Sequence, residues 1–176
     1  MSTRTVLQEA DISRALTRIA HEILESNRGA DDLVLLGIPT RGVTLAQRLG
    51  TLISGISQAP TPVGSLDVTL FRDDLAKHPT RSPKPTEIPA GGIDGKTVVL
   101  VDDVLFSGRS IRAALDAIQS IGRPAVVRLA ILVDRGHREL PIRPDFIGKN
   151  IPSARTERVN VRLHENDGAE EVSIEV

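Results

Sequence analysis

The sequence predicts one α/β domain, residues 1–176, built on a doubly wound, mostly parallel sheet. The run Thr97–Val101 reads TVVLV and is apolar on both faces, which is typical of a central strand covered by helices on both sides. Two more apolar runs, Leu33–Ile38 and Ala125–Val133, adjoin helical patterns. Strands that alternate with helices favour parallel pairing through right-handed crossovers. The length suits one domain with a real core.

The first half of the chain predicts two helices around the strand Leu33–Ile38. Asp11 is a plausible N-cap for the first helix, whose apolar residues recur at helical spacing: Ile12, Leu16, Ile19, Ile23 and Leu24. After the strand comes a loop, Pro39–Gly42, and a helix from about Val43 to Ile53. Ser65–Phe71 alternates apolar and polar side chains, which predicts a half-buried strand.

The segment 73–95 breaks the pattern of regular elements. It contains four prolines and several cationic side chains and ends in AGGIDG. A loop of this length inside a compact domain is usually functional or disordered. We therefore expect a long flexible flap.

The second half predicts a strand–helix–strand unit followed by a small C-terminal hood. The strand Thr97–Val101 leads to a helix over Ile111–Ile121, and Gly122 and Pro124 end it before the strand Ala125–Val133. The hood spans about 134–176, with short strands expected at Phe146–Lys149, Val159–Leu163 and Val172–Val176.

Composition limits the classes of function. The formal net charge is -1, so attraction to a nucleic acid would have to come from a local basic face. The absence of cysteine excludes disulfides and thiolate metal sites. The amino terminus lacks the apolar core of a signal peptide and no apolar run approaches membrane-spanning length, so we expect a cytoplasmic protein with no membrane partner.

Two adjacent carboxylates, Asp102 and Asp103, follow the central strand at the edge where open α/β sheets bind ligands. They can accept hydrogen bonds from the vicinal hydroxyls of a ribose. Ser107–Ser110 then offers backbone amides at a helix start, where a phosphate binds favourably. The competing interpretation is an acidic helix cap and an ordinary turn. A cap needs one carboxylate, however, and two neighbouring ones repel each other.

The stretch VVLVDDVLFSGRS, Val98–Ser110, resembles the phosphoribosyl pyrophosphate (PRPP) motif of the type I phosphoribosyltransferases. Four more segments, Ala15–Glu25, Leu35–Leu49, Asp67–Leu75 and Leu132–Pro152, are similar to the PyrR family of bifunctional pyrimidine operon attenuation regulators and uracil phosphoribosyltransferases. The resemblance implies the type I phosphoribosyltransferase fold. It also implies conversion of uracil and PRPP to UMP and pyrophosphate, with Mg²⁺ arriving on PRPP and no metal site built by the protein alone.

The resemblance assigns catalytic roles to Asp102, Asp103 and Arg41. It implies a substrate-binding set made of Thr40, Arg41, Asp102, Asp103, Val104, Leu105, Phe106, Ser107, Gly108, Arg109, Ser110, Arg135 and Val159. In that scheme the two aspartates hold the ribose hydroxyls and the backbone 105–110 holds the 5-phosphate. Arg135 and the backbone near Val159 lie close to the base.

The loop Thr40–Gly42 is implied to hold pyrophosphate, although its residues alone would suit a turn with a solvated arginine. Relatives carry Lys where this chain has Pro39, so one cation is absent from the loop. The flap is implied to close over PRPP, with Arg72 and Arg81 as candidate contacts. For Arg81 a solvated charge explains the residue equally well.

The family also binds a leader mRNA on a basic surface, and the matching residues here are Thr17, Arg18, His21, His137, Arg138, Arg143 and Lys149. Arg18 and His21 share a helix face. The alternative is that these are ordinary solvated charges, and Ser26 stands where some relatives carry a basic residue. With 2% aromatic residues, RNA binding would depend on phosphates and on splayed bases that meet arginines. A homodimer or higher homo-oligomer is also implied.

The leading hypothesis is therefore a uridine-nucleotide-responsive RNA-binding regulator that retains uracil phosphoribosyltransferase activity. Two alternatives stay open at this point. One is a phosphoribosyltransferase for another base, such as a purine. The other is a regulator that binds PRPP or UMP without significant turnover, which the Pro39 departure allows.

Overall fold

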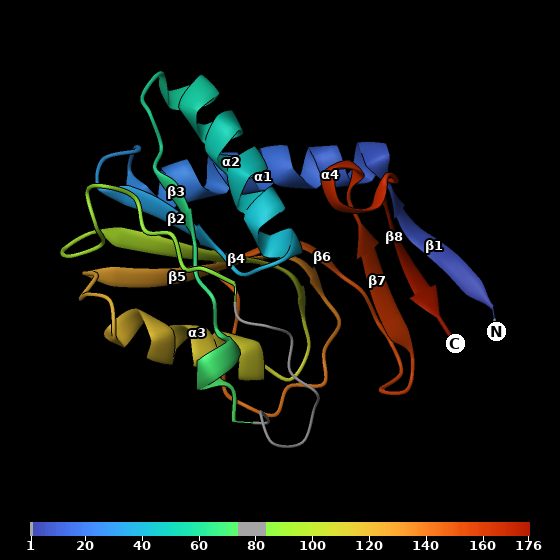
Figure 1. Ribbon diagram of the computed structural model, residues 1–176. Helices are drawn as coiled ribbons and strands as arrows, with labels where there is room; N and C mark the ends of the chain where they lie inside the picture. The colour runs from blue at the N-terminus through green and yellow to red at the C-terminus, as the bar shows by residue number, and fades with distance from the viewer. Residues whose placement is uncertain (1, 74–83) are drawn as a thin grey trace.

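The computed structural model describes residues 2–73 and 84–176 and has two sheets (Figure 1). The larger is parallel, with the strand order β3-β2-β4-β5-β6. Its strands are β2 (Leu33–Gly37), β3 (Val63–Ser65), β4 (Thr97–Leu105), β5 (Val126–Asp134) and β6 (Phe146–Asn150). The predicted doubly wound α/β fold is confirmed.

The central strand β4 is covered on both faces, as its apolar run predicts. Val99 and Val101 belong to one core cluster, whereas Val98 and Leu100 belong to the other. All four are at most 2% exposed. A strand that is buried on both faces has a continuous run of hydrophobic residues in its sequence.

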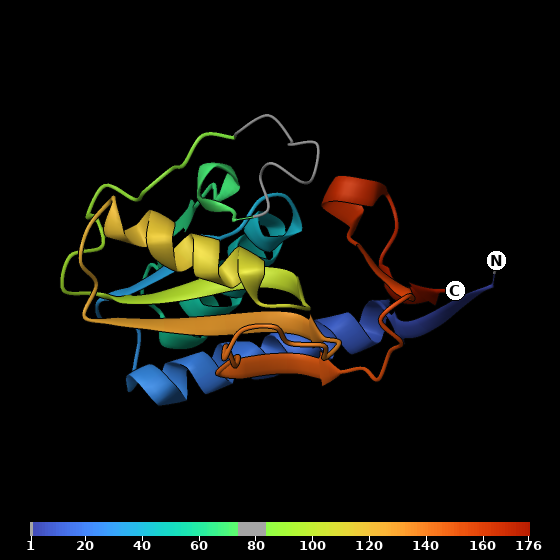
Figure 2. The same ribbon diagram turned by 90° about the horizontal axis from the view of Figure 1, so that it is seen from below.

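Helices α1 (Glu9–Asn27) and α2 (Arg41–Ser57) share the first core cluster, and α3 (Arg109–Gln119) belongs to the second. Figure 2 shows α1 and α3 on opposite sides of the sheet. The predicted N-cap of the first helix is wrong, because Gln8 occupies that position. Asp11 lies three residues later, where its carboxylate accepts the Gln8 N–H at 2.8 Å, so the side chain still satisfies an amide at the helix start.

The second sheet is antiparallel, in the order β1-β8-β7, and forms the hood with the short helix α4 (His164–Asp167). Its strands are β1 (Thr3–Gln8), β7 (Arg158–Arg162) and β8 (Glu171–Glu175). The chain termini therefore meet here, and Thr3 pairs with Glu175 (Figure 1). The sequence did not predict β1, and β6, placed in the expected hood, belongs to the main sheet.

The predicted strand Ser65–Phe71 is wrong. β3 ends at Ser65 and a 3₁₀ turn, η1 (Thr69–Phe71), follows. Asp67 ends the extended run, since its Oδ1 accepts the Thr69 hydroxyl at 2.7 Å and the Thr69 N–H at 3.2 Å. Leu66 and Val68 are buried as the alternation predicts, whereas Leu70 in the 3₁₀ turn is 71% exposed.

Both ends of the expected flap are described, and Arg81 lies outside the described residues. The second end is anchored to the sheet, because Ser65 and Glu87 exchange backbone hydrogen bonds of 2.9 Å. No helix in the described part of the chain is long and apolar enough to cross a membrane.

Candidate active site

The carboxylate pair lies at the carboxyl end of β4, inside the strand rather than after it. Oδ1 of Asp102 accepts the Asp103 N–H at 2.9 Å, and Oδ1 of Asp103 accepts the Val104 N–H at 2.8 Å. Burial raises the pKa of Asp102 well above its ordinary value, and the neighbouring charge of Asp103 raises it further. The Asp103 N–H and the charge of Arg72 act in the opposite direction. The fold therefore keeps Asp102 where desolvation and the neighbouring Asp103 oppose its ionisation.

The loop after β4 turns into α3 at Gly108, whose φ of 93° is a conformation that favours glycine. The Ser107 carbonyl accepts N–H groups from Glu139 and Leu140 at 2.9 and 3.2 Å. These bonds fasten the loop to the segment after β5. The first N–H groups of α3 have no acceptor within their own helix and remain suited to a phosphate.

Two arginines tie this loop to its surroundings: Arg72 lies on the flap side, and Arg109 is the first residue of α3. Arg72 donates to the Ser110 hydroxyl at 2.8 Å. Arg109 pairs with Glu139 at 3.1 Å and also with Asp73. The Arg109 side chain thus holds two loops together, while its backbone belongs to the expected phosphate loop.

The loop between β2 and α2 packs tightly against the end of β4. The Ile38 N–H donates to the Val101 carbonyl at 2.9 Å. A Cβ on Gly42 would stand 2.5 Å from the same Val101 oxygen. The peptide bond between Pro39 and Thr40 is cis. The structure therefore brings the loop Thr40–Gly42 beside the carboxylate pair.

Lys84 adds a cation that the sequence analysis did not single out. Its Nζ donates to the Thr40 hydroxyl at 2.9 Å. Lys84 stands just before the segment that the Ser65–Glu87 bridge anchors. No local pattern in a proline-rich loop reveals such a contact, which depends on how the flap returns to the sheet.

A cavity of about 380 Å³ lies between the start of α2, the carboxyl end of β4 and the hood. Arg41 and Asp103 line it with the whole of β7, together with Asp167 and Glu175. The polar residues of β7 were missed, although a signal existed: Arg158, Asn160 and Arg162 alternate and so share one strand face. The structure thus brings Val159 to the same cavity as Arg41 and Asp103.

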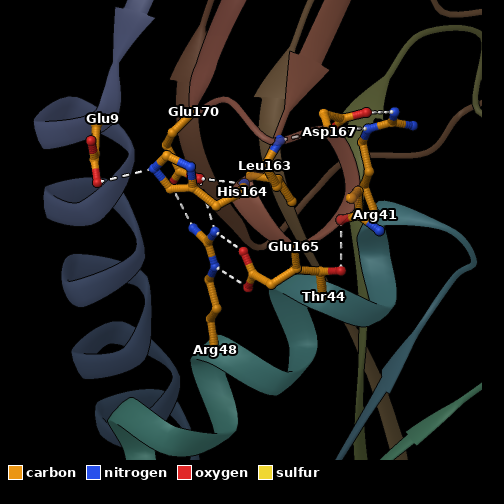
Figure 3. Close-up of polar contacts among 10 residues, drawn as sticks. Glu9, Arg41, Thr44, Arg48, Leu163, His164, Glu165, Asp167 and Glu170 are labelled. Carbon is orange, nitrogen blue, oxygen red and sulfur yellow. Dashed lines mark hydrogen bonds and ion pairs between the residues drawn. The ribbon is translucent and has the colours of Figure 1, made fainter.

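Arg41 makes a bidentate contact with the hood. Its Nε and Nη2 donate to the Asp167 carboxylate at 3.0 and 2.5 Å (Figure 3). Asp167 raises the pKa of Arg41, with a smaller contribution from Asp103. In return, Arg41 lowers the pKa of Asp167.

Arg135 does not line that cavity but a second one of about 500 Å³, beside His137, Arg138 and Asn150. It is buried, and its guanidinium lies 4.3 Å from the centre of the Phe106 ring. It donates to the carbonyls of Ala154 and Glu157 at 2.8 and 2.7 Å, and desolvation lowers its pKa. Arg135 therefore supports the phosphate loop and the segment before β7.

Of the expected RNA-binding residues, Thr17, Arg18 and His21 lie on α1 and Lys149 lies on β6, whereas His137, Arg138 and Arg143 lie between β5 and β6. Arg18 donates to the carbonyls of Ile147 and Gly148 in β6 at 3.1 and 2.7 Å, so the helix face lies next to Lys149. Thr17, His21, Arg143 and Lys149 are exposed, whereas His137 and Arg138 are half-buried.

Arg138 also has a structural task. It donates to the Phe106 carbonyl at 3.0 Å, to the Ile142 carbonyl at 2.9 Å and to Asp134 at 2.5 Å. Like Arg135, it ties the loop after β5 to the phosphate loop. The sequence alone could not show whether Arg138 holds the loop together or is exposed to RNA, because an arginine in this loop could do either.

Comparisons with known proteins agree with this geometry. The family model described as "Phosphoribosyl transferase domain" matches residues 2–166. A "Bifunctional protein PyrR" from Leifsonia xyli is 67% identical over 99% of this chain and 98% of its own length. One from Streptomyces coelicolor is 63% identical over 96% of this chain and 88% of its own.

Solved structures show the same fold at low identity. A hypoxanthine-guanine phosphoribosyltransferase from Bacillus anthracis has a TM-score of 0.74 at 16% identity, with both chains fully covered. A hypoxanthine phosphoribosyltransferase from Trypanosoma cruzi has a TM-score of 0.76 at 16% identity, over 98% of this chain and 94% of that one. The family-model match and the two close relatives show that this chain belongs to the phosphoribosyltransferase family and, within it, to the bifunctional PyrR proteins.

Proposed function

We propose that this protein converts uracil and PRPP to UMP and pyrophosphate, and that it regulates pyrimidine genes by binding leader mRNA in response to uridine nucleotides. The observation that carries the enzymatic part is one cavity that Arg41, Asp103 and Val159 line together. Each group of PRPP then has a counterpart: carboxylates for the ribose diol, helix amides for the 5-phosphate and a cationic loop for the pyrophosphate.

In this scheme N1 of uracil forms a bond to C1 of the ribose as the bond from C1 to pyrophosphate breaks. Asp102 and Asp103 hold the ribose hydroxyls and offset positive charge that develops on the ring. Asp103 lines the cavity and can accept the proton that N1 loses. Arg41 holds the leaving pyrophosphate, because a guanidinium matches phosphate oxygens in a bidentate manner.

Lys84 supplies a further cation at this loop through its contact with Thr40. This contact places a positive charge next to the loop that contains Pro39. We therefore include Lys84 among the pyrophosphate-binding residues and expect turnover rather than binding alone.

Mg²⁺ fits the donor set, because carboxylate oxygens line the cavity and this ion prefers oxygen ligands. No group of three or more candidate metal ligands assembles within residues 2–73 and 84–176. In this scheme the ion is held mainly by PRPP, where it would neutralise charge on the pyrophosphate.

For the base, the hood offers the backbone of β7 around Val159 and the side chain of Asn160. Arg135 contributes indirectly in this proposal, since it orders Phe106 and the segment before β7 through its stacking contact and its bonds to Ala154 and Glu157.

The enzymatic proposal is tested by incubating the protein with PRPP, Mg²⁺ and one base at a time. We expect UMP from uracil and no nucleotide from hypoxanthine or guanine. Turnover of a purine but not of uracil would overturn the assignment. Asp103→Asn should lower kcat/KM by about 10- to 100-fold, as for a lost hydrogen bond to a charged group, while the thermal unfolding temperature stays near that of the parent.

The regulatory proposal rests on the contact between α1 and β6, where Arg18 bonds to the Ile147 and Gly148 carbonyls next to Lys149. A homodimer would align two such surfaces, and both activities would operate in the cytoplasm. Mobility-shift titrations with the protein's own pyrimidine leader transcript should show tighter binding when UMP is present. Unchanged affinity would refute the nucleotide response.

A further inference from the structure

Arg41 belongs to the pyrophosphate loop, yet its partner comes from the other end of the chain. The Asp167 carboxylate accepts from Nε at 3.0 Å and from Nη2 at 2.5 Å. The Arg41 side chain is 30% exposed and that of Asp167 is 18% exposed. Both residues line the cavity with Asp103, so this ion pair is part of the cavity wall.

The carboxylate is itself held in place. Oδ2 of Asp167 also accepts the Leu163 N–H at 2.9 Å. The adjacent Asn166 accepts a hydrogen bond from the Thr44 hydroxyl at 2.8 Å. Asp167 therefore presents its oxygens to Arg41 from a fixed position.

Two further contacts complete what we call the α2–α4 clamp, defined as Arg41, Thr44 and Arg48 of α2 with Glu165, Asn166, Asp167 and Glu170 of the hood (Figure 3). Arg48 donates to Glu165 at 2.9 and 2.5 Å and to Glu170 at 2.6 and 2.8 Å. The three α2 residues share one helix face, so the clamp fixes the segment that carries Asp167.

The bidentate contact uses only one edge of the guanidinium. An arginine has five N–H donors in a rigid planar fork, and Asp167 takes one from Nε and one from Nη2. Nη1 points away from the carboxylate in Figure 3. A donor edge therefore remains for an anion while the plane of the group is set by the hood.

We propose that Asp167 is the positioning residue of Arg41: it holds the guanidinium by its Nε–Nη2 edge so that the remaining donors are oriented toward the pyrophosphate of PRPP. This inference rests on the proposed function of the site. It extends that function by giving the hood a part in pyrophosphate binding. A preoriented arginine loses less freedom when it binds its anion, and the gain appears as affinity.

Asp167→Asn tests the proposal with little change of shape. The asparagine keeps one acceptor but places an NH₂ group opposite an arginine donor. We expect the Kd of PRPP, measured by calorimetry with Mg²⁺, to rise about ten-fold, and the KM for uracil to change less than two-fold. The matched control is Glu165→Gln, which removes an ion pair from the same segment. Its carboxylate is 48% exposed and Arg48 keeps the nearly buried Glu170, so the Kd of PRPP should change less than two-fold.

The Arg41→Met background separates positioning from other roles. If Asp167 acts through Arg41, Asp167→Asn should change the Kd of PRPP less than two-fold in that background. An equal loss in both backgrounds would indicate a direct or metal-mediated role and overturn the proposal. Tighter PRPP binding by Asp167→Asn would indicate a competing anion, and an unchanged Kd would show no role; either result also overturns it. Failure of the wild-type protein to bind PRPP would instead refute the proposed function.

Discussion

The close approach of the pyrophosphate loop to β4 predicts that Gly42→Ala will lower the catalytic efficiency of the enzyme. A Cβ on Gly42 would lie 2.5 Å from the Val101 carbonyl oxygen, 3.2 Å from Cα of Asp102 and 3.3 Å from its Oδ1. Ordinary contact begins at 3.4 Å, so Gly42→Ala must separate the loop from the strand by about 0.9 Å. The nearest atoms are mainly backbone, so no side chain can rotate away to relieve the contact.

A misplacement of about 1 Å at a reacting centre can lower the rate by about 100-fold, which corresponds to about 2.7 kcal/mol. We therefore expect Gly42→Ala to lower kcat/KM for PRPP by about two orders of magnitude. Overpacking should also destabilise the fold by about 1–3 kcal/mol. The assay is steady-state UMP formation at varied PRPP, paired with thermal unfolding.

The control variant is Gly55→Ala in the same helix, where an added Cβ meets nothing within 4 Å. Alanine is the better helix former by about 1 kcal/mol, so this variant should be at least as stable as the parent and equally active. A Gly42→Ala protein that folds and keeps the parental kcat/KM for PRPP would refute the link between this contact and the pyrophosphate loop.

Three further predictions concern charges. Arg48 lowers the pKa of Glu165 to about 2 from 4.5. The ion pair therefore stabilises the fold fully above about pH 5, and this stabilisation is lost as the pH falls toward 2. In acid unfolding followed by circular dichroism, Glu165→Gln should lose less stability between pH 5 and pH 2 than the parent does. Lys84→Met should raise the KM for PRPP about three-fold, as for an exposed charge contact, whereas Lys84→Arg should not, and equal KM values in all three proteins would exclude Lys84 from the site. Arg143→Ala with Lys149→Ala should weaken binding of the leader RNA and reduce its salt slope by about 2 while uracil turnover stays at the parental rate; an unchanged slope would place the RNA elsewhere.

Local patterns in the sequence determined the three central strands of the main sheet and the place of the carboxylate pair on it. The run at Thr97–Val101 is apolar because β4 is covered on both faces, and that burial follows from residue type alone. Asp102 and Asp103 follow from the same pattern, since the end of a central parallel strand is where the fold opens. The spacing of apolar residues likewise predicted helices α1, α2 and α3, although not where each of them begins and ends.

Contacts between distant segments were decided only by the tertiary structure. No local sequence pattern shows that Thr3 pairs with Glu175 or that Lys84 donates a hydrogen bond to Thr40. Nor does any pattern show that Arg41 forms an ion pair with Asp167 and is not simply solvated. The sequence likewise led us to expect Arg135 near the base and Arg138 on the RNA-binding surface, whereas the fold gives both side chains backbone carbonyl partners. Periodicity reports which face of an element is buried, whereas the partner of a polar side chain depends on which segments the fold brings within about 3 Å of it.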